Sequence, residues 1–474
     1  MRNFNQNILV ALLFFIALTS CDDYLSPELE SLVNADNYYK NEQQLLAGVV
    51  NMYDGIQGVN STSTNDYHSL QVEFYLTEMR SDNTRTKAQE GEAAQFENFT
   101  IQATNGIVAD YYRSFYNVIF RANVVLANLD VASEANRANI EAEARFVRAY
   151  AYFNLVRLYG DIPLITTLID ASDKEVAYTR VPTDEIYDLI LEDLEMAVTA
   201  LDNTYKTRAS LAAAQTLLAK VYMTLEINYV QAQTLLESVI ASNQYSLEPN
   251  FKDVFYNELN NEIIFAIGYF PDTEDSQNFS AEWLNAVGRT SGVNYTTIES
   301  RQALDAMGGD RTLYSYRVDL DQPTQFQVAK YIPDGDPILG IDPTSSNPTR
   351  AGNDWIVLRY ADVLLLHVEA IMAGGNETSS PAALQSFQEV RYRAGLTDEV
   401  TSITKQELLD ERRVELAYEN HRMFDLIRFK EAVNVLSEFS DNNGYSFTTT
   451  DLLLPIPQRE INLSNGLMNQ NPGY

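Results

Sequence analysis

Apolar residues recur at helical spacing in a first block of the chain. Residues 141–159 show one continuous apolar stripe, made of Phe146, Ala149, Tyr150, Phe153 and Val156. Gly160 ends this predicted helix, and Pro163 prevents it from resuming. The same spacing predicts further helices over residues 41–53, 107–129, 183–197, 210–225 and 229–240.

Two of these helices form a pair that resembles a tetratricopeptide unit, which is a helical hairpin. Ser210 opens the first helix of the pair, and the second begins with the Tyr-x-x-Ala pattern of Tyr229 and Ala232. Thr183 is predicted to cap the helix that precedes the pair, with acidic residues in its first turn. The first block is therefore predicted to be a scaffold of paired helices.

A second helical block covers residues 355–437. Residues 355–373 are strongly apolar and are predicted to form one helix, with Trp355 packed in the core. Pro381 stands at the first position of the next predicted helix, after a serine N-cap. Thr404 and the glutamate three residues later form a capping box for the long helix that follows.

Two long regions interrupt these blocks. Residues 55–102 are irregular, and residues 243–354 are rich in Asn, Asp, Gly, Pro and Tyr, with a short strand predicted at residues 263–267. Long loops inside a compact protein are usually functional or disordered, and the aromatic content argues against disorder. We predict one mainly α-helical domain over residues 21–474, with ligand loops in these two regions and an extended tail over residues 451–474. Its helical scaffold covers mainly residues 36–54, 106–242 and 355–437.

The N-terminus is typical of an exported protein. An unbroken apolar stretch runs from Ile8 to Leu18, too short to span a membrane, and is followed by Thr-Ser-Cys. Leu18–Cys21 looks like a bacterial lipobox, which predicts a signal peptide over residues 1–20 and lipidation of Cys21. The alternative is an ordinary signal peptide beside an incidental cysteine. Several acyl chains on one residue would anchor the protein stably.

Composition and charge exclude several classes of function. The chain has 33 Lys and Arg against 66 Asp and Glu, a formal net charge of −33, so a nucleic acid would be repelled. The single cysteine excludes an internal disulfide framework and a thiolate zinc site. His68, His367 and His421 are too scattered to suggest a metal site, and we expect no cofactor.

Several segments together resemble the SusD/RagB family of surface nutrient-binding lipoproteins. They run in order from Cys21 to the last residue: the segment after the cysteine and those at Glu143–Leu164, Leu358–Ala370, Val390–Gly395, Glu411–Phe429 and Leu454–Tyr474. One departure is Asn420, where members commonly have glycine.

The resemblance implies a fold, a location and a partner. It implies tetratricopeptide-like hairpins that display ligand loops on one face, on a lipoprotein of the outer membrane that faces the cell exterior. Asp22 and Asp23 fit this location, because acidic residues after the cysteine accompany export to the outer face in surface lipoproteins of Bacteroidota-type bacteria. The implied partner is a TonB-dependent (SusC-like) transporter, over which the protein sits as a lid. The implied cargo is most often an oligosaccharide and in some members a peptide.

The acids Glu411, Glu415 and Glu419 fall on one face of a predicted helix, interleaved with arginines. A glycosidase would use two such carboxylates as acid and base. Arginines nearby would instead keep them ionised, which favours an ion-pair network that braces adjacent helices. We therefore expect no enzymatic activity.

Glycan capture requires flat aromatic faces ringed by polar side chains. With 29 tyrosines and two tryptophans, such a platform is expected to be mostly tyrosine. Trp283 is the leading candidate, although core packing is the alternative, and the resemblance adds Asp82 and Arg85, of which Asp82 could instead fold its loop as an Asx-turn. The further candidates from the two loop regions are Tyr67, His68, Tyr295, Tyr314 and Tyr316.

The predicted function is capture of a neutral oligosaccharide and its delivery to the transporter, because the acidic chain disfavours anionic glycans. Three alternatives remain open at this point. The cargo could be a peptide, the protein could be a glycosidase, or it could be an interaction scaffold without a small ligand.

Overall fold

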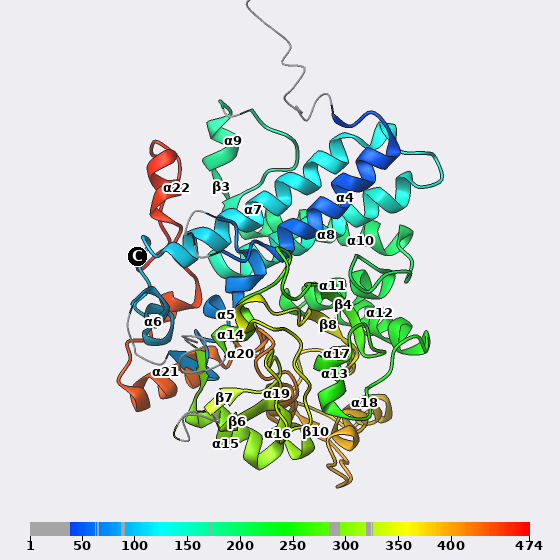
Figure 1. Cartoon of the computed structure of the whole chain (residues 1–474), viewed down its shortest axis with the longest axis vertical. Helices are drawn as coiled ribbons and strands as arrows, with labels where there is room; N and C mark the ends of the chain where they lie inside the picture. Colours follow the sequence, from blue (N-terminus) through cyan, green and yellow to red (C-terminus); the bar gives the residue numbers. More distant parts are fainter. Residues whose placement is uncertain are drawn as a thin grey trace, which may run out of the picture.

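Long helices packed side by side form one half of the molecule (Figure 1). The computed structural model describes residues 38–474 except 62, 64, 65, 87–90, 171, 284–293, 319–323 and 325, so the predicted signal peptide and Cys21 lie outside the described residues. Each helix of this half packs on the next along the chain. They are α4 (Glu42–Gln57), α7 (Gly106–Ala127), α8 (Arg137–Tyr159), α10 (Thr183–Ala200), α11 (Leu211–Thr224) and α12 (Tyr229–Ala241).

The ends of these helices follow from local sequence. The Asn41 side chain accepts a hydrogen bond from the Gln44 amide, and Ser210 caps α11 in the same way. Gly160 has a φ of 70°, so the chain leaves α8 in a conformation that favours glycine. The predicted cap at Thr183 is wrong: Thr183 is the first helical residue, after Pro182, and its amide donates to the Asp161 side chain at 3.1 Å.

The prediction of one helix over residues 355–373 is also wrong. Residues Trp355–Arg359 form strand β8, which pairs antiparallel with β4 (Ile263–Ile267), and helix α17 (Tyr360–Met372) follows. A fully apolar run has no period that separates a buried strand from a buried helix. The packing of Trp355 in the core is confirmed, since only 4% of its surface is exposed.

The helices after β8 begin where the sequence predicts. Pro381 is the first residue of α18, and Thr404 forms the expected capping box at the start of α19. α17 packs against α12, so the two helical blocks form one continuous assembly. The remaining helices of this block are α18 (Pro381–Arg393), α19 (Lys405–Glu415), α20 (Arg422–Arg428) and α21 (Ala432–Asn443).

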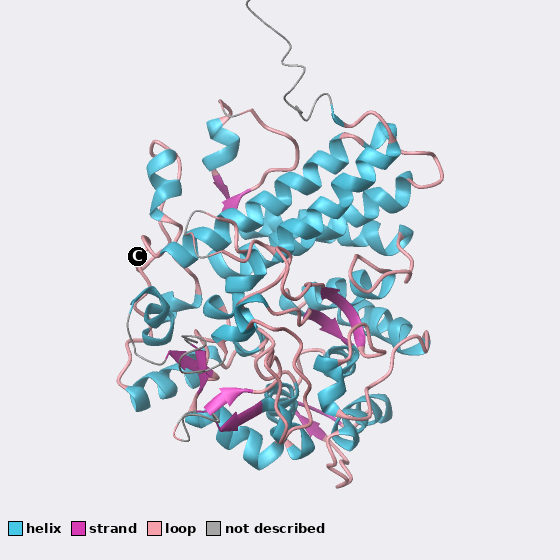
Figure 2. Ribbon diagram, in the orientation of Figure 1, coloured by secondary structure: helices cyan, strands magenta, loops and turns pink. Residues whose placement is uncertain are grey.

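Short elements fill the two loop regions (Figure 2). The first region contains α5 (Glu73–Leu76), β1 (Thr84–Thr86) and α6 (Gly91–Asn98). The second contains α13 (Phe251–Tyr256), α14 (Phe279–Glu282), β5 (Asn294–Thr296), α15 (Ile298–Met307), α16 (Thr312–Ser315), β6 (Tyr316–Val318) and β7 (Phe326–Val328). Smaller pieces elsewhere are β2 (Ile162–Pro163), α9 (Lys174–Tyr178), β3 (Arg180–Val181), β9 (Glu377–Thr378) and β10 (Ile403–Thr404).

The C-terminal tail lies over the first helical block. The Leu454 amide donates to the carbonyl of Leu158 at 2.7 Å, and the Asn471 side chain donates to that of Tyr159 at 2.9 Å. The predicted extended conformation holds only in part, because residues Gln458–Leu463 form the short helix α22.

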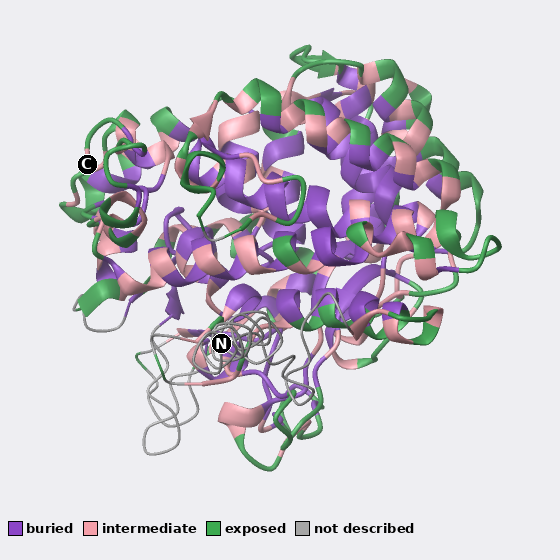
Figure 3. Cartoon of the chain, turned by 90° about the horizontal axis from the view of Figure 1, so that it is seen from above, coloured by how far each residue is buried: buried purple, intermediate pink, exposed green. Residues whose placement is uncertain are grey.

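The core lies between the facing sides of these helices, while their outer sides are exposed (Figure 3). In the part of the chain that the structure describes, no helix combines the length and apolar character that a membrane span requires.

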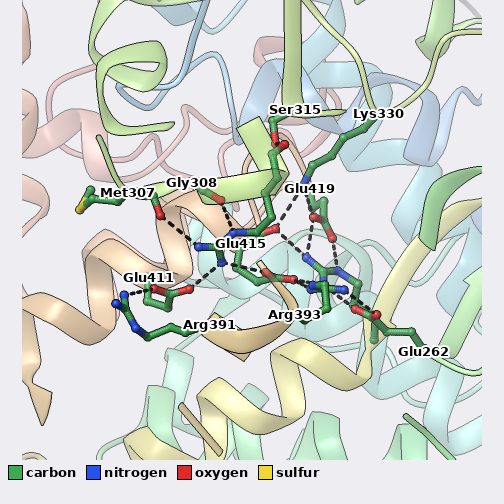
Figure 4. Close-up of polar contacts among 12 residues, drawn as sticks. Glu262, Met307, Gly308, Ser315, Lys330, Arg391, Arg393, Glu411, Glu415 and Glu419 are labelled. Carbon is green, nitrogen blue, oxygen red and sulfur yellow. Dashed lines mark hydrogen bonds and ion pairs between the residues drawn. The ribbon is translucent and has the colours of Figure 1, made fainter. Parts of the chain in front are cut away.

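A buried network of charges joins the second loop region to the second helical block (Figure 4). Arg359, at the end of β8, donates to Glu262 at 2.7 Å, to Glu415 at 2.5 Å and to Glu419 at 2.7 Å. All four side chains are at most 1% exposed. Burying charges is costly unless each one is paired, and here each one is.

Further cations from other elements complete the network. Arg311 donates to Glu411 at 2.5 Å and to Glu415 at 2.9 Å, and Lys330, which follows β7, pairs with Glu419. Arg393, at the end of α18, pairs with Glu262 and Glu415.

The predicted ion-pair network is therefore confirmed, with two corrections. Helix α19 ends at Glu415, so Glu419 lies in the turn beyond it, where Asn420 has a φ of 63°. Asparagine adopts this left-handed conformation more readily than other non-glycine residues. The neighbouring arginines of α19 point elsewhere, since Arg412 binds Asp425 and Arg413 binds Asp82.

Electrostatics in the network favour the charged forms. Burial alone would raise the pKa of Glu415, but Arg393, Arg359 and Arg311 hold that pKa well below its usual range. Such a carboxylate cannot donate a proton as a glycosidase acid must.

Replacing the central arginine should destabilise the fold severely. In Arg359→Met, buried carboxylates lose their partner, and we expect a loss of about 3–5 kcal/mol in the free energy of unfolding, measured by urea denaturation. The matched control is Arg350→Met, because Arg350 pairs at the surface with Glu274, whose side chain is 97% exposed. The control should change by less than about 1 kcal/mol. Equal effects of the two substitutions would contradict this account of the network.

Candidate functional site

The two loop regions meet at a pair of short strands. β1 from the first region pairs antiparallel with β5 from the second, in a register that places Arg85 opposite Tyr295. β7 lies beside β5, and α15 follows β5 directly. Segments more than 200 residues apart in sequence thus share one surface.

Side chains on this surface form what we call the arginine–aromatic face, defined by Arg85, Arg301, Tyr316 and Phe326. The Arg301 guanidinium lies 3.8 Å from the ring centroid of Phe326, and the rings of Tyr316 and Phe326 are 6.1 Å apart. Arg85 is exposed, and the other three are partly exposed. The Tyr316 hydroxyl donates to Asp305 at 2.6 Å.

The two arginines of this face lie close to each other. Burial lowers the pKa of Arg301, and the positive charge of Arg85 lowers it further. Arg301 donates to the carbonyl of Thr296 at 3.0 Å. The guanidinium of Arg85 has no hydrogen bond or ion pair within the described part of the chain.

The arginine–aromatic face carries the kinds of groups that contact sugars in proteins. Rings can cover the apolar side of a pyranose, while guanidinium groups donate hydrogen bonds to hydroxyls. Over the described ranges, no three His, Cys, Asp or Glu side chains converge in a way that could hold a metal ion.

A second feature at the junction is a polar cleft of about 250 Å³ between α5, α14 and the start of α7. Its walls include Tyr75, His68 and Glu282. Burial and the charge of Glu282 raise the pKa of Tyr75 well above its usual value, so its hydroxyl keeps its proton.

His68 connects the first loop region to α7 at the wall of this cleft. One ring nitrogen bonds the carboxylate of Asp110 on α7, and the other lies 2.9 Å from the carbonyl of Ser61. The His68 amide also donates to Asp110 at 3.2 Å. Burial acts to lower the pKa of His68, but the hydrogen bond and charge of Asp110 outweigh it and raise that pKa.

Trp283, the leading candidate from the sequence, is not at the surface. Its side chain is fully buried and packs against Phe74, Tyr331 and Tyr418, with ring centroids 5.3, 6.1 and 6.2 Å away. The expectation of an exposed tryptophan platform is therefore wrong for this structure, and core packing, the alternative, holds.

Asp82 is also buried, with 3% of its surface exposed. Arg422 binds its two oxygens at 2.8 and 3.0 Å, and Arg413 contacts it at 2.8 Å. Burial opposes ionisation, but these two guanidinium groups hold the pKa of Asp82 well below its usual range. Asp82 thus ties the first loop region to α19 and α20 from a buried position.

The remaining candidate ligand residues lie at separate places in the structure. Tyr295 is 2% exposed, beneath the surface. Tyr314 lines a different cleft of about 810 Å³ beside α13. Tyr67 is 42% exposed and lies under the guanidinium of Arg113.

Of the predicted ligand residues, Arg85 and Tyr316 are members of the arginine–aromatic face, while Tyr295 lies opposite Arg85 in the ladder but is buried. Sequence reasoning missed Arg301 and Phe326, the other two members of the face. An arginine and a phenylalanine carry no distinguishing pattern in sequence. They come beside the predicted residues because β1 pairs with β5, β6 pairs with β7, and β7 lies against β5.

Comparisons with known proteins identify the family that the chain resembles. The SusD family model matches residues 321–474, and a second model, described as starch-binding and associating with the outer membrane, matches residues 25–223.

Individual relatives span most of the chain. The SusD-like protein P2 of Formosa agariphila is 28% identical over 81% of this chain and 84% of its own length. The starch-binding protein SusD of Bacteroides thetaiotaomicron is 25% identical over 77% of this chain and 78% of its own length. Among solved structures, a laminarin-binding SusD-like protein superposes with a TM-score of 0.75 at 25% identity, over 92% of this chain and all of its own.

Anchoring of the first loop region by His68 should depend on pH. Because folding raises the pKa of His68, the stabilisation is fully present below the unfolded pKa of about 6.5 and is lost as pH rises through the folded value. We expect His68→Asn to weaken hydrogen-exchange protection of residues 66–72 at pH 6, by about 1.5–3 kcal/mol. The difference from the unmodified protein should shrink at pH 9. A difference independent of pH would show that the charge of His68 is not involved.

Proposed function

The chain belongs to the SusD/RagB family of glycan-binding outer-membrane proteins, and from that premise we propose that it captures a neutral oligosaccharide and delivers it to a TonB-dependent transporter. The observation that carries the proposal is the arginine–aromatic face, where the two loop regions converge. It offers ring surface and hydrogen-bond donors, and we propose that the cargo is bound and not cleaved.

A neutral cargo agrees with the charge of the molecule. The net charge of −33 repels an anionic polymer at long range. The guanidinium groups of Arg85 and Arg301 can donate to hydroxyls without requiring a negative partner. A shallow, solvent-exposed face of this kind predicts dissociation constants on the order of micromolar to millimolar.

Attachment to the outer membrane through Cys21 fits the arrangement of the helices. α4 begins shortly after the first described residue, Tyr38, and its 16 residues span about 24 Å. The elements α5, α14, β6 and β7 of the two loop regions lie beyond the far end of α4 (Figure 1). A lipid at Cys21 would therefore hold the chain by the end remote from the loop regions, which would leave them free to meet cargo.

Glycan binding should depend on the arginine–aromatic face. The side chain of Arg85 is exposed and has no hydrogen bond or ion pair with described residues, so Arg85→Ala should leave the fold intact and weaken binding. Tyr316→Ala removes ring surface, for which a loss of about 2- to 10-fold in affinity is expected. Affinity electrophoresis in gels that contain laminarin, starch or another neutral polysaccharide, followed by calorimetry with the bound glycan, measures both effects.

The matched control is Tyr392→Ala, an exposed tyrosine on α18, which should bind like the unmodified protein. Binding by Arg85→Ala and Tyr316→Ala at unmodified strength would show that the arginine–aromatic face is not the site. If the unmodified protein bound none of the neutral polysaccharides, the proposed function itself would be contradicted.

Lipidation should decide where the protein is found. In the native bacterium, the unmodified protein should fractionate with the outer membrane, incorporate labelled palmitate and co-purify with a TonB-dependent transporter. Cys21→Ser should be recovered without label in the soluble fraction. Retention of Cys21→Ser in the outer membrane, with label, would contradict anchoring at this residue.

A further inference from the structure

A second groove with tyrosine walls lies apart from the arginine–aromatic face. It has a volume of about 370 Å³ and runs between α7, α9 and α22. Figure 1 shows α9 and α22 standing beside the first half of α7. We call it the tyrosine groove, and its walls include Tyr67, Tyr112, Tyr116, Tyr178, Arg113 and Arg459.

The groove offers aromatic surface in quantity. The rings of Tyr112 and Tyr116 are 4.8 Å apart on successive turns of α7. Tyr67 is 42% exposed and Tyr178 is partly exposed, so ring surface reaches the solvent on two sides of the groove. Contiguous ring surface that reaches the solvent is typical of ligand-binding grooves.

Polar groups in the groove have capacity for a ligand. The hydroxyl of Tyr116 donates to the carbonyl of Pro163 at 2.7 Å, and the hydroxyl of Tyr112 is buried beside that of Tyr116. The exposed guanidinium of Arg459 and the carboxyl of Glu460 stand at the rim.

One segment separates the groove from the polar cleft of the loop junction. Tyr67 lines the groove, and the next residue, His68, lines the cleft. On α7, Asp110 faces the cleft while Arg113 faces the groove. The segment at Tyr67 and His68 is thus the boundary between the two cavities, and an oligosaccharide that crosses it could occupy both the cleft and the groove.

We propose that the tyrosine groove is a second carbohydrate-binding site, which takes a neutral segment of the same polysaccharide. Rings with interspersed hydroxyl, guanidinium and carboxyl groups match the alternating apolar faces and hydroxyls of pyranoses. The inference rests on the proposed function, since it assumes that the cargo is a glycan. Two weak sites on one molecule bind a polymer more tightly than either site alone, because the second contact forms within the complex.

The test uses the full chain with both groove walls altered. Tyr67→Ala combined with Tyr178→Ala should weaken retardation by laminarin or starch gels by about 3- to 10-fold. In calorimetry with laminarihexaose or maltoheptaose, the stoichiometry should fall from two sites towards one. Tyr392→Ala is again the control. If the double variant unfolds, Leu463→Arg, which places a charge at the groove from an exposed position, provides the same comparison.

The outcomes separate the two proposals. Unchanged polysaccharide binding and stoichiometry in the groove variants, with weakened binding in Arg85→Ala, would overturn the second site and leave the proposed function standing. Residual binding in Arg85→Ala that disappears when the groove substitutions are added would support the second site. An unmodified protein that no neutral polysaccharide retards would overturn both.

Discussion

The pairing of buried charges around Arg359 is the constraint on which the architecture depends. Its carboxylate partners come from the residue before β4, the end of α19 and the turn beyond it, and the nearby cation Arg393 comes from the end of α18. A charge in such a place is tolerated only with its partners present, so the elements that carry them must assemble together. The network fixes how the second loop region sits on the helices, because Arg311 and Lys330 of that region are part of it.

The first loop region is fastened to the same helices by a different set of contacts. Asp82 reaches the arginines of α19 and α20, and Glu78 accepts a hydrogen bond from the amide of Asn420 at 2.8 Å. Both loop regions therefore contact α19 and the turn beyond it, although they are far apart in the chain. The short β1–β5 ladder needs little intrinsic stability, because the elements beneath it already hold its strands in place.

Periodicity predicted the helices well because most of them bury one face against a neighbour. It failed at Trp355–Arg359, where a strand buried on both faces leaves no alternation to read. The candidate site was harder to predict. Trp283 and Asp82 carry the residue types that ligands need, but the core and the buried arginines use them first, and Arg301 and Phe326 become recognisable only when three strands assemble.

The contacts of the C-terminal tail determine when the first helical block can complete its folding. Asn471 donates to the carbonyls of Tyr159 and Leu454, so the end of the longest helix in the first block is sealed by almost the last residues of the chain. A ribosome releases Asn471 312 residues after Tyr159. Until then the last carbonyl groups of α8 have no partner from the tail, so the first helical block cannot complete its contacts until the tail has been synthesised.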